Sequence, residues 1–335
     1  MKKRTSLNRV SWIVLVISLA YFLLLCLPNA YGARDEGTLL ATSVDEPVTY
    51  AVLTHMFRPA DSLKSAVMHW VIYGDYHYGF IFYFFSGLVL LPVQWITGNL
   101  QSQTALNLWI LRQMVSVLPM LLAILILVRK QTGFNSLRLT LPLLFVMLTM
   151  PAVLRNNIQW WHPDALSIFT VVLTLVFLDR DKFQFNLFFF LAAAACGLAV
   201  GIKLAGIFFV ITIPAYLVVG WLYHRIRFGK MLLFGLVFVM IMSAVAILSN
   251  PFVFIPAERQ KLVDIQLYKT QELDQGNGKM NIDDAKSPSA WNWTLNTWFG
   301  HPLFLAFVFL SLIIGCIWAS MEPQPTATLA PSATP

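Results

Sequence analysis

The sequence predicts an all-α fold, a polytopic transmembrane helical bundle with about eight or nine membrane segments, and three observations support it. Of the 335 residues, 58% are apolar and only 12% are charged, whereas soluble domains carry roughly 25% charged residues. Apolar runs that approach the ~20 residues needed to cross a bilayer recur along most of the chain. Short clusters of Lys and Arg separate these runs, as in cytoplasmic loops of membrane proteins.

The apolar runs lie at about residues 11–29, 78–97, 106–128, 139–154, 165–178, 186–202, 204–222, 231–254 and 302–320. Basic residues before the first run predict a signal anchor whose N-terminus lies in the cytoplasm. The basic clusters at 129–138, 180–182 and 224–230 are then also cytoplasmic. This orientation places Asp164 and Lys203 outside, on the external face of what we expect to be a prokaryotic plasma membrane.

The segment 78–97 is expected to be re-entrant or to cross the membrane incompletely. Three apolar runs separate Asp45 from Asp164, and only an even number of crossings keeps both residues outside. Gly87 and Pro92 interrupt the segment, and irregular backbone at membrane depth is tolerated where it lines a cavity. The alternative is that the basic cluster at 129–138 departs from the charge rule.

Residues 1–320 are interpreted as one membrane-embedded unit with large external loops at 30–77 and 255–300. The short run at 165–178 predicts a funnel that dips into the membrane from outside. Residues 321–335 form a Pro-, Thr- and Ala-rich tail that cannot bury apolar area, so we expect disorder there.

Charge and cysteine content exclude several classes of function. The net charge of +7 comes from the loop clusters and indicates membrane topology rather than binding to nucleic acid. Cys26, Cys196 and Cys316 lie inside apolar runs without a C-x-x-C spacing, which indicates neither disulfides nor a cysteine metal site. The sequence contains no G-x-G-x-x-G or Walker-type loop to hold a nucleotide.

The first candidate site is Asp45-Glu46-Pro47, in the loop after the first crossing. A carboxylate near a membrane is easily raised in pKa and can act as a general base toward a hydroxyl group. Alternatively, Asp45 and Glu46 only cap a helix whose first turn contains Pro47.

The second candidate site is His162 and Asp164, which follow Trp160 and Trp161 at the start of an apolar run. Ionisable groups at membrane depth are costly and mark functional sites by default. The open alternative is that His162 and Asp164 cap the helix and that the tryptophans anchor it at the membrane interface.

Lys203 and Arg155 are isolated cations beside apolar runs. Each either extends its charge to the lipid headgroups or offers it to an anion such as phosphate in a dry cavity. His77 and Tyr78 add an imidazole and a phenol just before the segment 78–97, where an interfacial aromatic belt is the alternative.

Together these residues resemble the GT-C superfamily of integral membrane glycosyltransferases, particularly its protein O-mannosyltransferase and aminoarabinose-transferase branch. The similar features cover residues 5–300 and are the acidic pair Asp45-Glu46, the Arg112-containing run, the second external acid Asp164 and the Gly-rich segment around Lys203.

The resemblance implies transfer of a sugar from a polyprenyl-phosphate donor to a protein, lipid or glycan acceptor on the external face, with inversion at the anomeric carbon. It implies that Asp45 activates the acceptor hydroxyl, with Glu46 and Asp164 as the other catalytic acids. No cofactor is required by this chemistry, although His162 and Asp164 are compatible with a divalent metal.

The resemblance further assigns Lys203, together with Arg155, to the departing lipid phosphate, where negative charge develops. His162, His77 and Tyr78 are then the other substrate-binding residues. Two alternatives stay open: a transporter or flippase with ion-coupling acids, and an inactive, truncated scaffold, because the chain ends one helix after the similar region.

Overall fold

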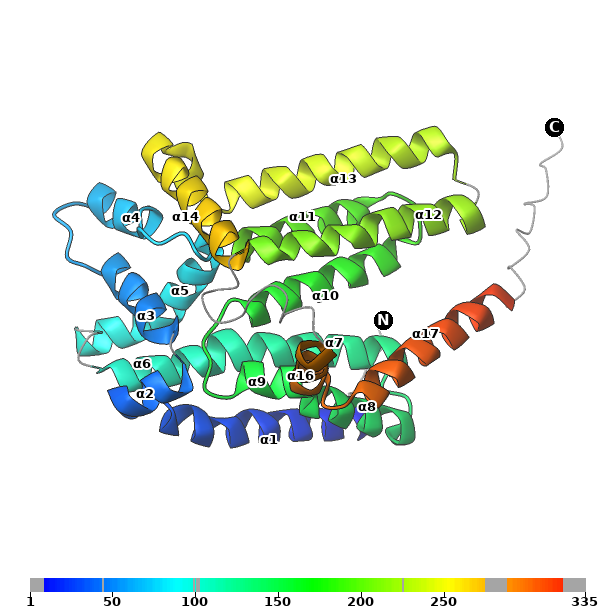
Figure 1. The fold of residues 1–335 in the computed structure, drawn as a ribbon, viewed down its shortest axis with the longest axis horizontal. Coiled ribbons are helices and arrows are strands. Elements are labelled where there is room, and N and C mark those ends of the chain that lie inside the picture. The colour runs from blue at the N-terminus through cyan, green and yellow to red at the C-terminus, as the bar shows by residue number, and fades with distance from the viewer. Residues whose placement is uncertain are drawn as a thin grey trace, which may run out of the picture.

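The computed structural model describes residues 9–43, 45–98, 100, 103–224, 226–274 and 288–321. Within these residues the chain forms helices and no strand, which confirms the all-α class. The long helices lie roughly side by side (Figure 1). They are α1 (Arg9–Tyr31), the continuous α6 (Thr104–Leu111), η2 (Arg112–Val117) and α7 (Leu118–Thr132), α8 (Leu137–Thr149), α10 (Asp164–Asp181), α11 (Leu187–Ile202), α12 (Thr212–His224), α13 (Phe228–Leu248) and α17 (Pro302–Met321).

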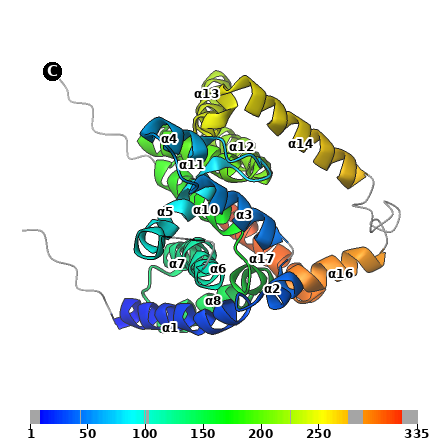
Figure 2. The same ribbon diagram turned by 90° about the vertical axis from the view of Figure 1, so that its left-hand side faces the viewer.

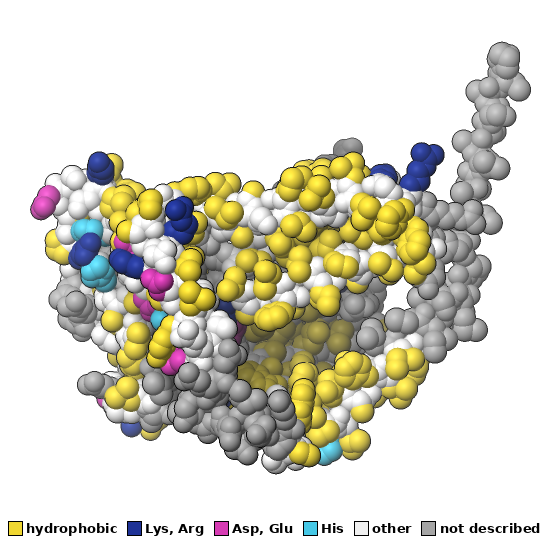
Figure 3. All heavy atoms as spheres, turned by 45° about the horizontal axis from the view of Figure 1, so that its top comes forward, with side chains coloured by type: hydrophobic (Ala, Val, Ile, Leu, Met, Phe, Trp, Pro, Cys, Tyr) yellow, Lys and Arg dark blue, Asp and Glu magenta, His cyan; other side chains and the backbone are white. Residues whose placement is uncertain are grey.

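Most of the shorter helices gather at one end of the bundle, which we call the polar end because charged side chains collect there (Figures 1 and 3). The remaining elements are α2 (Glu36–Thr42), α3 (Asp45–Met56), α4 (Leu63–Val71), α5 (Phe80–Thr97), α9 (Pro151–Asn157), η3 (Leu204–Ile211), η4 (Pro251–Phe254), α14 (Pro256–Asp274) and α16 (Pro288–Phe299). The stretches 30–77 and 255–300, expected to be loops, are therefore largely helical. The predicted tail from residue 322 onward, and residues 275–287, lie outside the described residues.

Five helical stretches of the described chain are long and apolar enough to cross a membrane: α1, α5, α6–α7, η3–α12 and α13. The bent pair α8–α9 makes a sixth if it is counted as one span. This confirms a polytopic membrane protein, with fewer full-length spans than the apolar runs predicted. Four runs account for the difference. The run at 139–154 is bent between α8 and α9, α10 carries charged residues at both ends, α11 has only 16 residues, and α17 contributes only the short apolar stretch Pro302–Ser311.

Helix α5 runs without a break through Gly87 and Pro92, so the interruption predicted in this segment is absent. Although α5 is long enough to span, both of its ends pack at the polar end. The Gly79 N–H, just before α5, donates to the Ile202 carbonyl at 2.9 Å, and Leu100, just after α5, accepts from Tyr50 of α3 at 2.8 Å. The sharp bend lies instead between α8 and α9, which meet at 61° next to Pro151.

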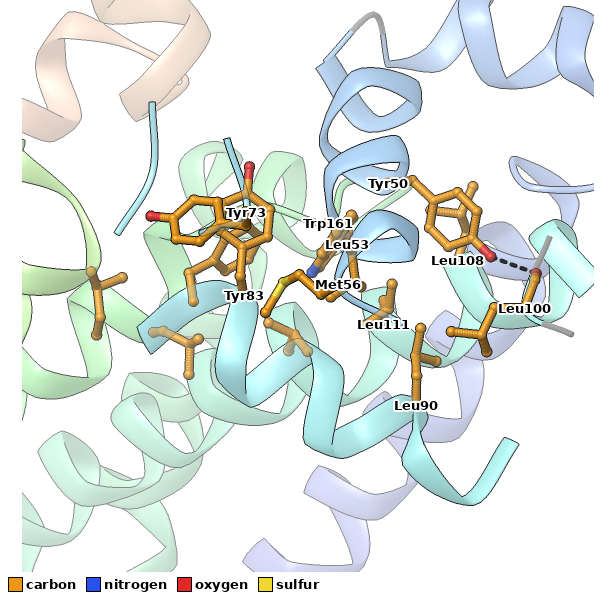
Figure 4. Packing of buried hydrophobic residues seen from close by; sticks show 14 of the residues in the cluster. Tyr50, Leu53, Met56, Tyr73, Tyr83, Leu90, Leu100, Leu108, Leu111 and Trp161 are labelled. Carbon is orange, nitrogen blue, oxygen red and sulfur yellow. Dashed lines mark hydrogen bonds between the residues drawn. The ribbon is translucent and has the colours of Figure 1, made fainter. Parts of the chain in front are cut away.

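A cluster of buried side chains fixes α3 against α5, α6 and the segment before α10 (Figure 4). It includes Leu53 of α3, Tyr83 of α5, Leu108 of α6, and Trp161, all essentially inaccessible to solvent. The indole of Trp161 also donates to Ser86 of α5 at 3.1 Å. The cluster therefore sets where the N-terminus of α3, and with it Asp45, lies relative to the segment that carries His162 and Asp164.

Small residues allow α11 to lie very close to α13 and to the start of α5. A Cβ atom on Gly197 would meet the Met242 main chain of α13, and one on Gly79 would overlap the Gly201 carbonyl. Close approach through small residues is typical of helices that pack inside membranes. Here it brings Lys203, directly after α11, beside Tyr78, directly before α5.

The remaining surface of the bundle is mostly apolar. Figure 3 shows apolar side chains covering the helices away from the polar end and lining a hollow on this face. Along α13, for example, Leu232, Leu233 and Leu236 are each more than half exposed. Such exposure is costly in water and suits contact with lipid.

Candidate active site

Glu46 joins three segments of the polar end through its carboxylate. Oε1 accepts from Arg112 Nε at 3.0 Å and from the Trp161 main-chain N–H, and Oε2 accepts from Arg112 Nη2 at 2.5 Å. Both side chains of the Glu46–Arg112 pair are fully buried. Burial raises the pKa of the Glu46 carboxyl, whereas the Arg112 guanidinium and the Trp161 amide act to lower it.

Arg112 also donates to two main-chain carbonyls at the end of α1 and just after it. Nη1 donates to the Asn29 carbonyl at 2.9 Å, and Nη2 donates to the Gly32 carbonyl at 3.3 Å. A buried ion pair is tolerable only when such additional hydrogen bonds are present. The pair therefore ties α1, α3, η2 and the Trp161 segment together.

Arg112 begins η2, a π-helical stretch within the long α6–α7 helix. Such stretches are rare and are often found at functional sites. Ser116, in the same stretch, accepts a hydrogen bond from the His162 main-chain N–H at 3.3 Å. Arg112 and Ser116 of η2 thus hold both Glu46 and the residues that lead to Asp164.

Asp45 is the first residue of α3 and, unlike Glu46, is exposed. Its carboxylate has neither a hydrogen-bond nor an ion-pair partner among the residues that the structure describes. It borders a cavity of about 470 Å³ together with Arg155, Gln159 and Trp160. A solvent-accessible carboxylate at a cavity, fixed by the buried neighbour that follows it, is well placed to accept a proton from a ligand.

Asp164, the first residue of α10, connects a chain of polar groups. Its Oδ1 accepts from Lys203 Nζ at 2.7 Å, and its Oδ2 lies 3.0 Å from Nδ1 of His162. Nε2 of the same ring lies 2.9 Å from the Tyr78 hydroxyl, within hydrogen-bond distance. The structure thereby brings together four residues that the sequence singled out.

The electrostatic environment of the Tyr78 phenol includes several acids. Burial is the largest cause that raises the pKa of the Tyr78 phenol, and the negative charges of Asp45, Asp164 and Asp75 raise it further.

Lys269 of α14 is a further residue of this region that the sequence analysis did not identify. Its Nζ lies 5.8 Å from the centre of the Tyr78 ring. Burial lowers the pKa of Lys269 most; the positive charge of Lys203 also lowers it, whereas Asp75 and Asp45 raise it. Lys203 and Lys269 are therefore both found in this region, and burial disfavours the charged form of Lys269.

A second cavity of about 460 Å³ lies beside this region between α11, α13, η4 and α14. Tyr78 and Gly201 border it, and most of its lining is apolar, including Val200, Leu204 and Leu262. It shares no lining residue with the cavity at Asp45. The region therefore contains two cavities: a mainly apolar one at Tyr78 and a more polar one at Asp45.

The other predicted site residues make no direct contact with Asp164 or Lys203. His77 borders the apolar cavity and pairs with Asp75. Arg155 lies at the Asp45 cavity, not beside Lys203 as its expected shared role implied. Glu46 is fully enclosed, so in this structure it cannot touch a substrate as a catalytic acid would. Within the described residues, no three His, Cys, Asp or Glu side chains come together as a metal site.

Comparison with known proteins gives one match. The sequence model of glycosyltransferase family 87 matches residues 80–333. The matched region starts at α5 and includes Arg112, His162, Asp164, Lys203 and Lys269. No curated protein and no solved structure matches the chain significantly.

Proposed function

The chain belongs to glycosyltransferase family 87, and from this premise we propose that it transfers a sugar from a polyprenyl-phosphate donor to an acceptor hydroxyl. The observations that support this most are the unengaged carboxylate of Asp45 at one cavity and the two cations, Lys203 and Lys269, in the region of Tyr78 beside another. A glycosyl transfer from a phosphate needs a base for the acceptor and positive charge for the leaving group.

In the proposed reaction, Asp45 accepts the proton of the acceptor hydroxyl. The acceptor oxygen forms a bond to the anomeric carbon while the bond from that carbon to the phosphate oxygen breaks with its electron pair. Attack from the side opposite the phosphate inverts the anomeric configuration. Polyprenyl phosphate leaves, and Lys203 and Lys269 compensate the charge that develops on it.

Asp164 and His162 orient the lysine rather than react in this proposal. The 2.7 Å contact to Asp164 holds Lys203 Nζ in place, and Tyr78 holds His162 from the other side. The mainly apolar cavity that starts at Tyr78 and Gly201 supplies a surface for the first isoprene units of the donor. A lipid-linked donor also agrees with the absence of a nucleotide-binding loop in the sequence.

We further propose that the polar end faces the outside of the cell and that the N-terminus is cytoplasmic. Basic residues mark the opposite end of the bundle: Arg129 and Lys130 end α7, Lys182 follows α10, and Lys230 lies in the first turn of α13. Positive charge of this kind is retained on the cytoplasmic side.

The test of this function is transfer by the purified protein in lipid nanodiscs, with a panel of radiolabelled polyprenyl-phosphate sugars and total membrane lipids and glycans as acceptors. We expect Asp45→Asn to lower transfer by roughly 10²–10⁴-fold, because the amide cannot accept the proton. Asp61→Asn is the matched control, since Asp61 is an exposed acid in the same stretch. Wild-type transfer by Asp45→Asn, or an equal loss in Asp61→Asn, would refute the assignment.

A further inference from the structure

The cavity beside Asp45 contains a cation that the proposed reaction does not use. Arg155, at the end of α9, borders this cavity of about 470 Å³, which is separate from the mainly apolar one. No carboxylate of the described residues forms an ion pair with Arg155, whereas Lys203 is paired with Asp164 and Arg112 with Glu46. Its charge is therefore available to a ligand.

Two aromatic rings hold the Arg155 guanidinium in place. Its Cζ atom lies 5.0 Å from the ring centre of Trp298 on α16 and 5.9 Å from that of Trp160. Cation–π contacts use the face of the guanidinium and leave donors on its edge free for a planar or tetrahedral anion. An exposed arginine normally loses much side-chain entropy when it binds a ligand, and this contact reduces that cost in advance.

The other side of the same cavity carries the Asp45 carboxylate. A negative group on the ligand is repelled by Asp45 and attracted by Arg155, so it can bind only toward the arginine. A hydroxyl group elsewhere on that ligand is then directed to Asp45. Asp45 and Arg155 together thus favour one orientation of a ligand that has both a hydroxyl group and an anionic group.

We propose that this cavity is the acceptor site and that it takes a hydroxylated phosphate ester, with the phosphate bound by Arg155 between Trp160 and Trp298. The inference rests on the proposed function, because it uses Asp45 as the base. It reassigns Arg155 from the donor phosphate to the acceptor. Leu154 and Ile158 on the cavity wall supply apolar contacts next to the phosphate. The phosphate belongs either to a lipid headgroup or to a soluble phosphate ester.

The experiment measures binding to the full-length protein in phosphatidylcholine nanodiscs, without donor and without turnover. The probes are phosphatidylglycerol, neutral monoglucosyl diacylglycerol, soluble glycerol phosphate and undecaprenyl phosphate. We expect Arg155→Ala to weaken phosphatidylglycerol or glycerol phosphate binding about tenfold or more, as loss of a charge-assisted hydrogen bond does. The neutral lipid should bind more weakly than phosphatidylglycerol, and undecaprenyl phosphate binding should remain unchanged.

Two further variants separate a built site from general attraction to a positive surface. Trp298→Ala leaves the net charge unchanged but releases Arg155, so anion binding should fall, and Trp298→Phe should restore most of it. Arg259→Ala removes an exposed charge on α14 away from the cavity and should have no effect. If Arg155→Ala weakens the binding of glycerol phosphate only, the acceptor is soluble. If it weakens the binding of phosphatidylglycerol, the acceptor is a lipid.

The inference is overturned if Arg155→Ala leaves the binding of phosphatidylglycerol and of glycerol phosphate unchanged. It is also overturned if the variant weakens the binding of undecaprenyl phosphate instead. Lys203→Ala distinguishes this outcome from failure of the proposed function. If Lys203→Ala leaves undecaprenyl phosphate binding intact, the donor assignment fails, while the result for Arg155 and phosphatidylglycerol still decides the acceptor site.

Discussion

Glu46 and Arg112 form a fully buried, two-point ion pair in which the same carboxylate also accepts the Trp161 main-chain N–H. Glu46 follows Asp45 directly, and Trp161 lies three residues before Asp164. The pair therefore couples the position of the exposed Asp45 to that of the partly buried Asp164, while both of its own side chains are fully buried. A group that acts in this way is a positioning residue.

The first prediction concerns this pair. Glu46→Gln keeps the size of the side chain but leaves the Arg112 charge buried without a counter-charge, which costs about 3–5 kcal/mol. We expect a clear fall in the unfolding temperature of the purified protein and loss of transfer. Lys130→Ala, which breaks the exposed pair with Asp179, should cost no more than about 1 kcal/mol. Equal thermal shifts in the two variants would contradict the role of Glu46.

The second prediction concerns Gly79. Its main chain meets Gly201 so closely that a Cβ atom would overlap the Gly201 carbonyl. Gly79→Ala should therefore push α5 away from α11, cost about 1–3 kcal/mol as overpacking does, and separate Tyr78 from Lys203. Gly229→Ala is the matched control, because a Cβ there meets no atom within 4 Å. Thermal unfolding and undecaprenyl phosphate binding of both variants check this; wild-type values for Gly79→Ala would disprove the close contact.

The third prediction concerns pH. Burial lowers the pKa of Lys269 below its ordinary value of 10.5, so the folded protein releases this proton at a lower pH than the unfolded chain. Between the lowered pKa and 10.5 the unfolded state binds more protons, and Lys269 makes stability increase with pH in that window. Phosphate binding needs the charged form, so donor affinity should decrease over the same window.

Lys269→Arg tests this directly, because arginine stays charged throughout that range. The variant should bind undecaprenyl phosphate with an affinity that no longer decreases as the pH rises toward 10.5. Lys64→Arg, at an exposed lysine of α4, should leave the wild-type pH profile unchanged. A profile that is the same for wild type and Lys269→Arg would rule out Lys269 as a donor contact.

The fourth prediction concerns metal ions. In the proposed reaction Lys203 and Lys269 supply the positive charge that a divalent metal would otherwise supply, so we expect transfer to continue after treatment with EDTA and dialysis. The measurement compares rates before treatment, after treatment and after addition of Mg²⁺ or Mn²⁺. Activity that disappears and returns only with metal would show that the lysines are not sufficient.

The sequence predicted the fold class, and it singled out several residues that the structure brings together, because those signals are local. An apolar run predicts a membrane helix, and ionisable residues such as Asp164 and Lys203 stand out against it. The sequence also showed Lys203 alone between two apolar runs, and in the structure α11 ends directly before Lys203.

Other parts of the site depend on tertiary contacts and had no local signal. Lys269 belongs to a polar helix with several charged residues, and only the packing of α14 over Tyr78 distinguishes it. Glu46 resembled a second catalytic acid because it is next to Asp45, yet successive residues of a helix point about 100° apart. One therefore reaches the cavity while the other enters the core.

The view along the bundle toward its polar end shows α6 and α7 continuing one another near the centre, between α1 and α10 (Figure 2). The π-helical stretch η2 that joins them closes wider turns than an α-helix, and so accommodates an additional residue in the same rise. Removing one residue from 112–117 would therefore restore regular winding while leaving α6 and α7 in nearly the same relative orientation. This stretch is thus a place where such a chain can gain or lose one residue over evolution without turning the helices on either side.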